Sequence, residues 1–219
     1  MIDFEAVRKN PDIRTYITRA DESLSALGYT EHSFAHVTHV AECAKNILES
    51  LGFDEKTVEN ARIAGYLHDI GNLVNRVDHS QSGAVMAFRI LDKMGMPPED
   101  IAEIVTAIGN HDEGTGVAVN PVAAALIIAD KSDVRRSRVR NSDPTSFDIH
   151  DRVNYSVVNS GLTVDAKEKC VHLTLTVDTE ISSVMDYFEI FLGRMIMCRK
   201  AAERLGLRFT LTVNGQRLL

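Results

Sequence analysis

The sequence lacks any run of apolar residues long enough to cross a lipid bilayer, although 44% of its 219 residues are hydrophobic. Its first residues, MIDFEAVRKNPDIRTYI, carry charges throughout, whereas a secretory signal has an apolar centre. Cysteine is scarce, and Cys43, Cys170 and Cys198 are spaced neither as a disulfide framework nor as paired zinc ligands. We therefore expect a cytoplasmic protein that does not act at a membrane.

Positive charge is also in deficit, because 24 Lys and Arg residues face 31 Asp and Glu residues and the net charge is −7. Proteins that bind extended nucleic acid gain most of their affinity by neutralising phosphates, so this balance argues against such a partner. Residues 131–140, KSDVRRSRVR, are a local exception that could form one basic pocket. The length suits one domain, alone or with a small appendage.

Apolar residues recur at helical spacing up to about residue 140, which predicts a bundle of helices joined by short turns. Ser33 occupies an N-cap position before one helix, and Gly52 the position where that helix stops. Asn120-Pro121, a cap followed by a first-turn proline, opens the last helix. The predicted helices cover residues 33–51, 57–70, 82–94, 98–110 and 121–136.

The periodicity changes after about residue 150. Apolar and polar residues alternate in CVHLTLTVD, as in a strand with one buried face, and residues 161–164 could pair with it as a hairpin. An amphipathic helix over 181–205 and a further alternating stretch over 207–213 complete a β-β-α-β unit. The predicted fold class is thus mainly α, with a helical domain over residues 1–145 and a small α+β appendage over 146–219.

In the helical part, several histidine and aspartate side chains lie at the ends or on the core-facing sides of apolar helices. His68 and Asp69 close an apolar helix, and Asp130 ends the apolar run AAALIIA, where an unneutralised carboxylate would be costly to bury. His36 lies on the side of its helix that should face the core. These four groups could meet around one divalent cation, and the lack of a thiolate favours Fe, Mn, Zn, Ni, Co or Mg over a soft metal.

The motifs HVTHVA, YLHDIG and IIADKSD resemble those of the HD-domain superfamily of metal-dependent phosphohydrolases. That pattern is a histidine, a His-Asp pair and a later aspartate, each at a helix edge of an all-helical body. The resemblance covers about residues 30–140 and implies that His36, His68, Asp69 and Asp130 bind a first metal ion.

Two further motifs resemble the branch of the superfamily that binds two metal ions. His79 lies in DHSQSGAVM and His111 in IGNHDEGTG, where Asp112 replaces the second histidine of a His-His-Glu stretch. The resemblance implies that Asp69 bridges the two ions and that His79 and His111 bind the second one. Asp112 would either bind the ion as a carboxylate or orient His111.

Departures from the family patterns narrow the substrate. The chain has no Gly-Tyr-Pro tripeptide after His111, which disfavours cyclic dinucleotides, and no Glu-Asp after the His-Asp pair, which disfavours guanosine polyphosphates. Asn72 stands where many relatives carry a lysine. Lys131, Arg135 and Arg138 are the candidates to supply the positive charge of that lysine.

The resemblance predicts a phosphomonoesterase or phosphodiesterase that acts on a nucleotide or a small phosphorylated metabolite through a metal-activated water. Lys131 and Arg135, expected one helical turn apart, would hold the phosphate. For any single arginine of the run from Arg135 to Arg140, a solvated helix end is the slightly favoured alternative. His39 is a candidate proton donor to the leaving group. His32 is expected to face solvent.

Two alternatives keep the same metal ligands. One is a di-iron protein that cleaves an organic substrate with oxygen, and the other is a non-catalytic metal-binding or interaction protein. The β-β-α-β unit carries no cluster of ligands, so we expect no catalysis from it. It would pack on the helical body or pair with a second copy through a strand edge, and we favour a homodimer.

Overall fold

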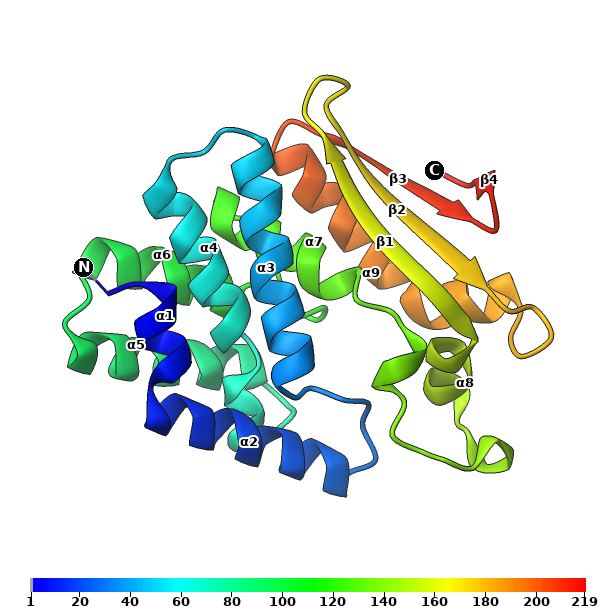
Figure 1. Ribbon diagram of the computed structural model, residues 1–219, viewed down its shortest axis with the longest axis horizontal. Helices are drawn as coiled ribbons and strands as arrows, with labels where there is room; N and C mark the ends of the chain where they lie inside the picture. The colour runs from blue at the N-terminus through cyan, green and yellow to red at the C-terminus, as the bar shows by residue number, and fades with distance from the viewer. Residues whose placement is uncertain (1) are drawn as a thin grey trace.

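The computed structural model describes residues 2–219, and its helices begin and end at local capping signals (Figure 1). Ser33 caps α3 by accepting a hydrogen bond from the Ala35 amide, and Asn120 caps α7 in the same way through Ala123. The helical body comprises α1 (Phe4–Lys9), α2 (Pro11–Ala26), α3 (Phe34–Ser50), α4 (Glu55–Leu67), α5 (His79–Met94), α6 (Pro98–Gly109) and α7 (Pro121–Lys131), with a 3-10 turn at Ile70–Leu73 between α4 and α5.

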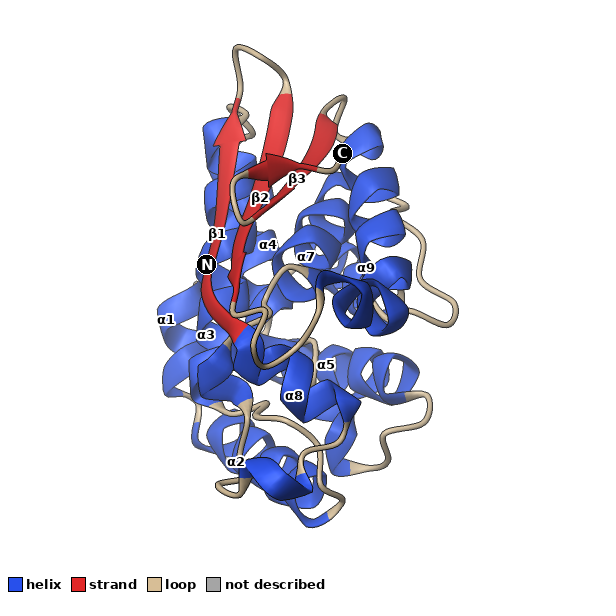
Figure 2. Ribbon diagram, turned by 90° about the vertical axis from the view of Figure 1, so that its right-hand side faces the viewer, coloured by secondary structure: helices blue, strands red, loops and turns tan. Residues whose placement is uncertain are grey.

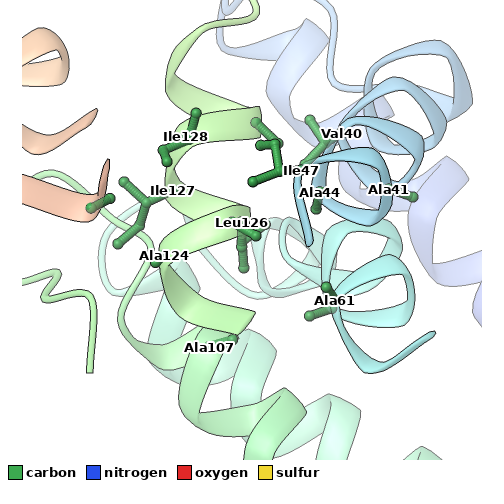
Figure 3. Packing of buried hydrophobic residues seen from close by; sticks show 14 of the residues in the cluster. Val40, Ala41, Ala44, Ile47, Ala61, Ala107, Ala124, Leu126, Ile127 and Ile128 are labelled. Atoms are coloured by element: carbon green, nitrogen blue, oxygen red, sulfur yellow. The ribbon is translucent and has the colours of Figure 1, made fainter. Parts of the chain in front are cut away.

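Helix α7 lies at the centre of the body. All of its residues from Val122 to Lys131 are buried, because α3, α4 and α6 pack around it on one side and α9 packs on the other. Figure 3 shows Leu126 of α7 on the side of the helix near Ala44 and Ile47 of α3, whereas Ile127 and Ile128 lie on the other side. An apolar helix buried all round holds its last residues, including Asp130, inside the protein.

Two glycines permit the close approaches on which the body depends. A Cβ on Gly65 of α4 would lie 2.7 Å from the Cα of Ala41 in α3, so these two helices touch backbone to backbone. A Cβ on Gly71 would collide with the His79 carbonyl and the Gly83 amide. The turn after the His-Asp pair therefore sits directly against the start of α5.

The C-terminal part forms the predicted β-β-α-β unit with two additions. Its elements are α8 (Ile149–Ser156), β1 (Val157–Asp165), β2 (Cys170–Val177), α9 (Val184–Arg204), β3 (Arg208–Val213) and β4 (Gln216–Arg217). The sheet order is β1-β2-β3-β4, with β2 and β3 parallel and the other pairs antiparallel. Helix α8 and strand β4 are the additions, and the predicted fold class is confirmed.

Helix α9 joins the two parts because it packs against both α7 and the sheet (Figure 2). Its residues Tyr187, Phe191 and Met195 belong to the same buried cluster as the apolar residues of α7. The predicted boundary at residue 145 falls in the 3-10 turn Pro144–Ser146 and stays a prediction. No helix within residues 2–219 has both the length and the apolar character needed to cross a membrane.

The prediction that the last helix of the body continues to residue 136 is wrong. Helix α7 ends at Lys131, and Arg135 is extended, with φ −159° and ψ 149°. The chain leaves the helix because Asp133 is drawn inward, where its carboxylate binds His36. As a result, Lys131 and Arg135 do not share a helix face.

Candidate metal centre

Four side chains predicted as first-metal ligands converge at one point between α3, α4 and α7. The Nε2 atom of His36 lies 3.6 Å from Asp69 Oδ2 and 3.5 Å from Asp130 Oδ1. The Nε2 atom of His68 lies 3.2 Å and 3.7 Å from the same two oxygens. Ligands of one ion with bonds of about 2.1 Å are separated by roughly 3 to 4 Å, so the spacing of these atoms suits a shared cation.

The other nitrogen of each imidazole ring is held by the protein. His36 Nδ1 donates to Asp133 Oδ2 at 2.7 Å, and His68 Nδ1 donates to the Gly65 carbonyl at 2.8 Å. Each Nε2 lone pair therefore points toward the carboxylates. Both Nε2 atoms are buried without a hydrogen-bond partner, which is costly for an imidazole unless an ion binds there. These residues fit a divalent metal ion.

Asp133, which is not among the residues predicted from the sequence, also contacts the cluster. It is buried, it orients His36, and it is itself held by Arg135 Nε at 2.7 Å and by Arg138 Nη1 at 3.6 Å. The available signal was its position three residues after Asp130, a spacing that places two side chains on the same side of a helix. A partner such as Asp133 fixes the ring of a metal-binding histidine and raises its basicity.

Both carboxylates of the cluster are kept ionised. Burial alone would raise the pKa of Asp69, but His68, His32 and His79 together hold that pKa well below its usual range. Burial likewise acts against the charged form of Asp130, yet Lys131, with Nζ 2.8 Å from Oδ2, holds the pKa of that carboxyl well below its usual range. Asn72, in the place of the family's lysine, donates to Asp69 Oδ1 at 2.9 Å and so orients this carboxylate.

The predicted second-metal residues also meet. His79 Nε2 lies 3.5 Å from Asp69 Oδ1 and 3.2 Å from His111 Nε2. Both rings donate through Nδ1 to backbone carbonyls, His79 to Arg76 and His111 to Ile108, so both Nε2 atoms face the cluster. Burial lowers the pKa of His111 to about 3, which keeps this imidazole neutral, as a metal ligand must be.

Two groupings of ligand atoms are thus close enough to hold an ion. One is His36, His68 and Asp130, and the other is His68, Asp69 and His111. Asp112 approaches His79 Nε2 only to 3.9 Å and is partly exposed, which leaves it at the margin of the second grouping.

Of the three residues predicted to contact the substrate, one lies at the cluster and two do not. Lys131 is buried beside Asp130 and lines the pocket over the cluster. Arg135 instead donates to Asp133 and to Ser137, away from that pocket. The His39 side chain is 54% exposed and lies by β1, at 3.8 Å from Asp133, so the structure does not bring it to the cluster.

Four further residues line the pocket over the cluster and were not predicted to act together: His32, Arg76, Arg138 and Arg194. The expectation that His32 faces solvent is wrong, because its ring is partly buried 5.4 Å from the ring of His36. Arg194 comes from α9, more than fifty residues beyond the last motif, so nothing in the sequence connected it with the site.

Comparison with known proteins gives three findings. The family model described as HD domain matches residues 33–138. An uncharacterised protein of Methanocaldococcus jannaschii is 26% identical over 160 residues, which are 63% of this chain and 61% of that protein's length. A crystal structure described as a predicted HD superfamily hydrolase from an uncultured Thermotogales bacterium is 27% identical, with a TM-score of 0.42 over 60% of this chain and 73% of that one.

Proposed function

Because the chain belongs to the HD-domain superfamily through residues 33–138, we propose that it is a metal-dependent phosphohydrolase for a nucleotide or a small phosphorylated metabolite. Membership of the superfamily supports a metal-dependent hydrolase. That the bond it cleaves is a phosphoester bond is the part that we propose. One observation carries it: the buried Nε2 atoms of His36 and His68 lack hydrogen-bond partners and face two ionised carboxylates.

His36, His68, Asp69 and Asp130 would hold the first ion, and Asp69 with His79 and His111 a second. A divalent ion at such donors lowers the pKa of water enough to supply a nucleophile near neutral pH and neutralises phosphoryl oxygens. The chain's own residues orient these donors, with Asp133 fixing the His36 ring and Asn72 fixing the Asp69 carboxylate.

Lys131 is suited to a charge role at the same place. Its ammonium group is 2.8 Å from Asp130 Oδ2 and 4.0 Å from Glu113, and its side chain is only 5% exposed. A buried cation beside a metal site interacts strongly with an anionic substrate, because little water screens it. We assign to Lys131 the binding of a phosphoryl oxygen.

The test combines elemental analysis with phosphate release from a panel of nucleotides and model phosphoesters. The parent protein should contain a divalent metal and hydrolyse at least one member of the panel, and Asp69→Ala should lose both. Asp92→Ala, at an exposed position of α5, is the matched control and should keep both. An Asp69→Ala variant that hydrolyses the best substrate as fast as the parent would refute the proposal.

The di-iron alternative is favoured only by the presence of the second grouping around Asp69 and His111. It predicts iron in the purified protein, a mixed-valent iron signal and no phosphate release. The same elemental and product analysis therefore separates the two functions.

A further inference from the structure

The pocket over the metal ligands opens into a much larger cavity, and the C-terminal unit forms part of its wall. The larger cavity has a volume of about 720 Å³, within the usual range for small-molecule sites. Residues of α8 and α9, including Asp151 and Phe191, and Asp148, the N-cap of α8, line it opposite residues of the helical body. Helices outside the HD domain therefore enclose the space beside the candidate metal centre.

Four side chains line both hollows and mark the passage between them: His32, Arg76, Arg138 and Arg194. Three of the four are guanidinium groups, in a chain whose net charge is −7. With Lys131 they place four cations around the inner pocket, where Asp69 and Asp130 also lie. Glu113 pairs with Arg194 and Asp133 pairs with Arg138, so the charges are largely balanced, but the nitrogens that these pairs leave unbonded can still receive an anionic ligand.

Arg194 is held in a way that leaves its outer edge free. Its Nε donates to Glu113 Oε1 at 2.7 Å, and its guanidinium lies 4.5 Å from the centre of the Phe191 ring. Within residues 2–219 no group accepts a hydrogen bond from its Nη1 or Nη2. A guanidinium fixed through Nε presents these two nitrogens as a fork, the geometry that binds phosphate through two hydrogen bonds.

The two arginines of the helical body are fixed in a comparable manner. Arg138 is buried and donates through Nε and Nη1 to the carbonyls of Glu31 and Asp133. Arg76 donates through Nη1 to Asn72 Oδ1 at 3.4 Å, and its guanidinium lies 5.7 Å from the centre of the Tyr29 ring. Both groups therefore keep donors for a ligand while their positions are set by the protein.

We infer that Arg194 of α9, together with Arg76 and Arg138, binds the phosphate of the substrate at the passage. This inference rests on the proposed function, and it makes the C-terminal unit a part of the active site. The outer cavity then holds the remainder of the substrate.

The lining of the outer cavity indicates the chemistry of that remainder. Asp78, Asp148 and Asp151 contribute acceptors, whereas Ile190 and Phe191 contribute an apolar surface. All three arginines of the outer cavity lie at the passage, so a second phosphate farther out would meet these carboxylates. The substrate class is therefore a phosphomonoester whose organic part offers hydroxyl or amino donors and one apolar face.

Equilibrium binding of inorganic phosphate, measured by calorimetry on the full-length protein before and after removal of metal, tests the arginine site without requiring turnover. Arg194→Ala should weaken phosphate binding at least about tenfold in both the metal-loaded and the metal-free protein. Arg194→Lys keeps the positive charge but not the two-nitrogen fork, so its phosphate affinity should lie between those of the parent and Arg194→Ala. Arg199→Ala, an exposed arginine of the same helix, should bind as the parent does. On the best phosphomonoester, Arg194→Ala should raise KM with metal content unchanged.

The outcomes separate this inference from the proposed function. Arg194-dependent phosphate binding in a protein that hydrolyses no phosphoester would uphold the phosphate site and refute the hydrolase. If the parent hydrolyses phosphoesters and Arg194→Ala keeps the phosphate affinity and KM of the parent, the hydrolase is upheld and the phosphate site is refuted. A parent that binds no phosphate overturns the inference. If Arg194→Ala fails to fold, Arg194→Gln, which keeps a donor for Glu113, takes its place in every comparison.

Discussion

At the scale of single residues, the site depends on side chains that touch no ion. The sequence singled out His36, His68, Asp69 and Asp130 because each lies at a helix edge, where burial of a polar group is costly, and the structure brings the four side chains together. Their role as metal ligands stays a prediction. Asp133 and Arg194 could not be singled out, since their roles come from contacts across the fold and not from their neighbours in sequence. His39 shares the helix of His36, but its side chain is 54% exposed and approaches Asp133 Oδ1 only to 3.8 Å.

Asp133→Asn should weaken metal binding about 10- to 100-fold, because the His36 ring loses the carboxylate that orients it. Calorimetric titration of metal-free protein with Mn²⁺ measures the affinity, and Asp92→Asn is the control. Circular dichroism of both variants checks that the fold is retained. Equal affinities for Asp133→Asn and the parent would contradict the assigned role.

Two of the three cysteines should be unreactive in the folded protein. Burial raises the pKa of Cys43 to about 12 and raises that of Cys198 as well, so at pH 8 almost none of either thiol is the reactive thiolate. A thiol reagent should therefore label both slowly at pH 8 and quickly after denaturation, with mass spectrometry identifying the sites. Labelling of Cys43 and Cys198 in the folded protein at the rate of free cysteine would be inconsistent with this burial.

At the scale of elements, glycine determines how closely the ligand-bearing helices approach. Gly65 lets α4 lie against α3, which brings His68 near His36, and Gly71 lets the turn after Asp69 touch the start of α5 at His79. The sequence predicted where these helices lie, because caps and periodicity are local. It misplaced the end of α7, because the inward pull of Asp133 on the chain is a tertiary contact.

Gly65→Ala should lower the free energy of unfolding by about 1 to 3 kcal/mol, because its Cβ would lie 2.7 Å from the Cα of Ala41 and force α3 and α4 apart. Urea denaturation measures the change. Gly193→Ala is the matched control in helix α9, where a Cβ meets nothing within 4 Å, and it should stabilise the protein slightly. A Gly65→Ala variant as stable as the parent would show that the helix contact is not close.

At the scale of the whole molecule, the two predicted parts share one hydrophobic core. Helix α7 is apolar on every side, and α9 covers the side that α3 and α4 leave free (Figure 1). The alternation of apolar and polar residues predicted the strands of the sheet. No local pattern predicted which surface of the helical body the sheet and α9 would cover. The homodimer through a strand edge, the cytoplasmic location and the boundary at residue 145 stay predictions, and light scattering tests the first.

A chain ending at residue 145 should not fold cooperatively, because loss of α9 exposes the apolar face of α7 to water. Thermal unfolding should show one sharp transition for the full chain, and none, or aggregation, for residues 1–145. A sharp transition for the shortened chain at a similar temperature would mean that the two parts are independent.

The central claim is that the Nε2 atoms of His36 and His68 and the carboxylates of Asp69 and Asp130 share one divalent ion. Anomalous scattering from a crystal grown with Mn²⁺, recorded near the manganese edge, locates that ion directly. The account predicts a strong peak within bonding distance of all four side chains. A well-ordered cluster with no peak, or manganese bound only elsewhere on the protein, would contradict it.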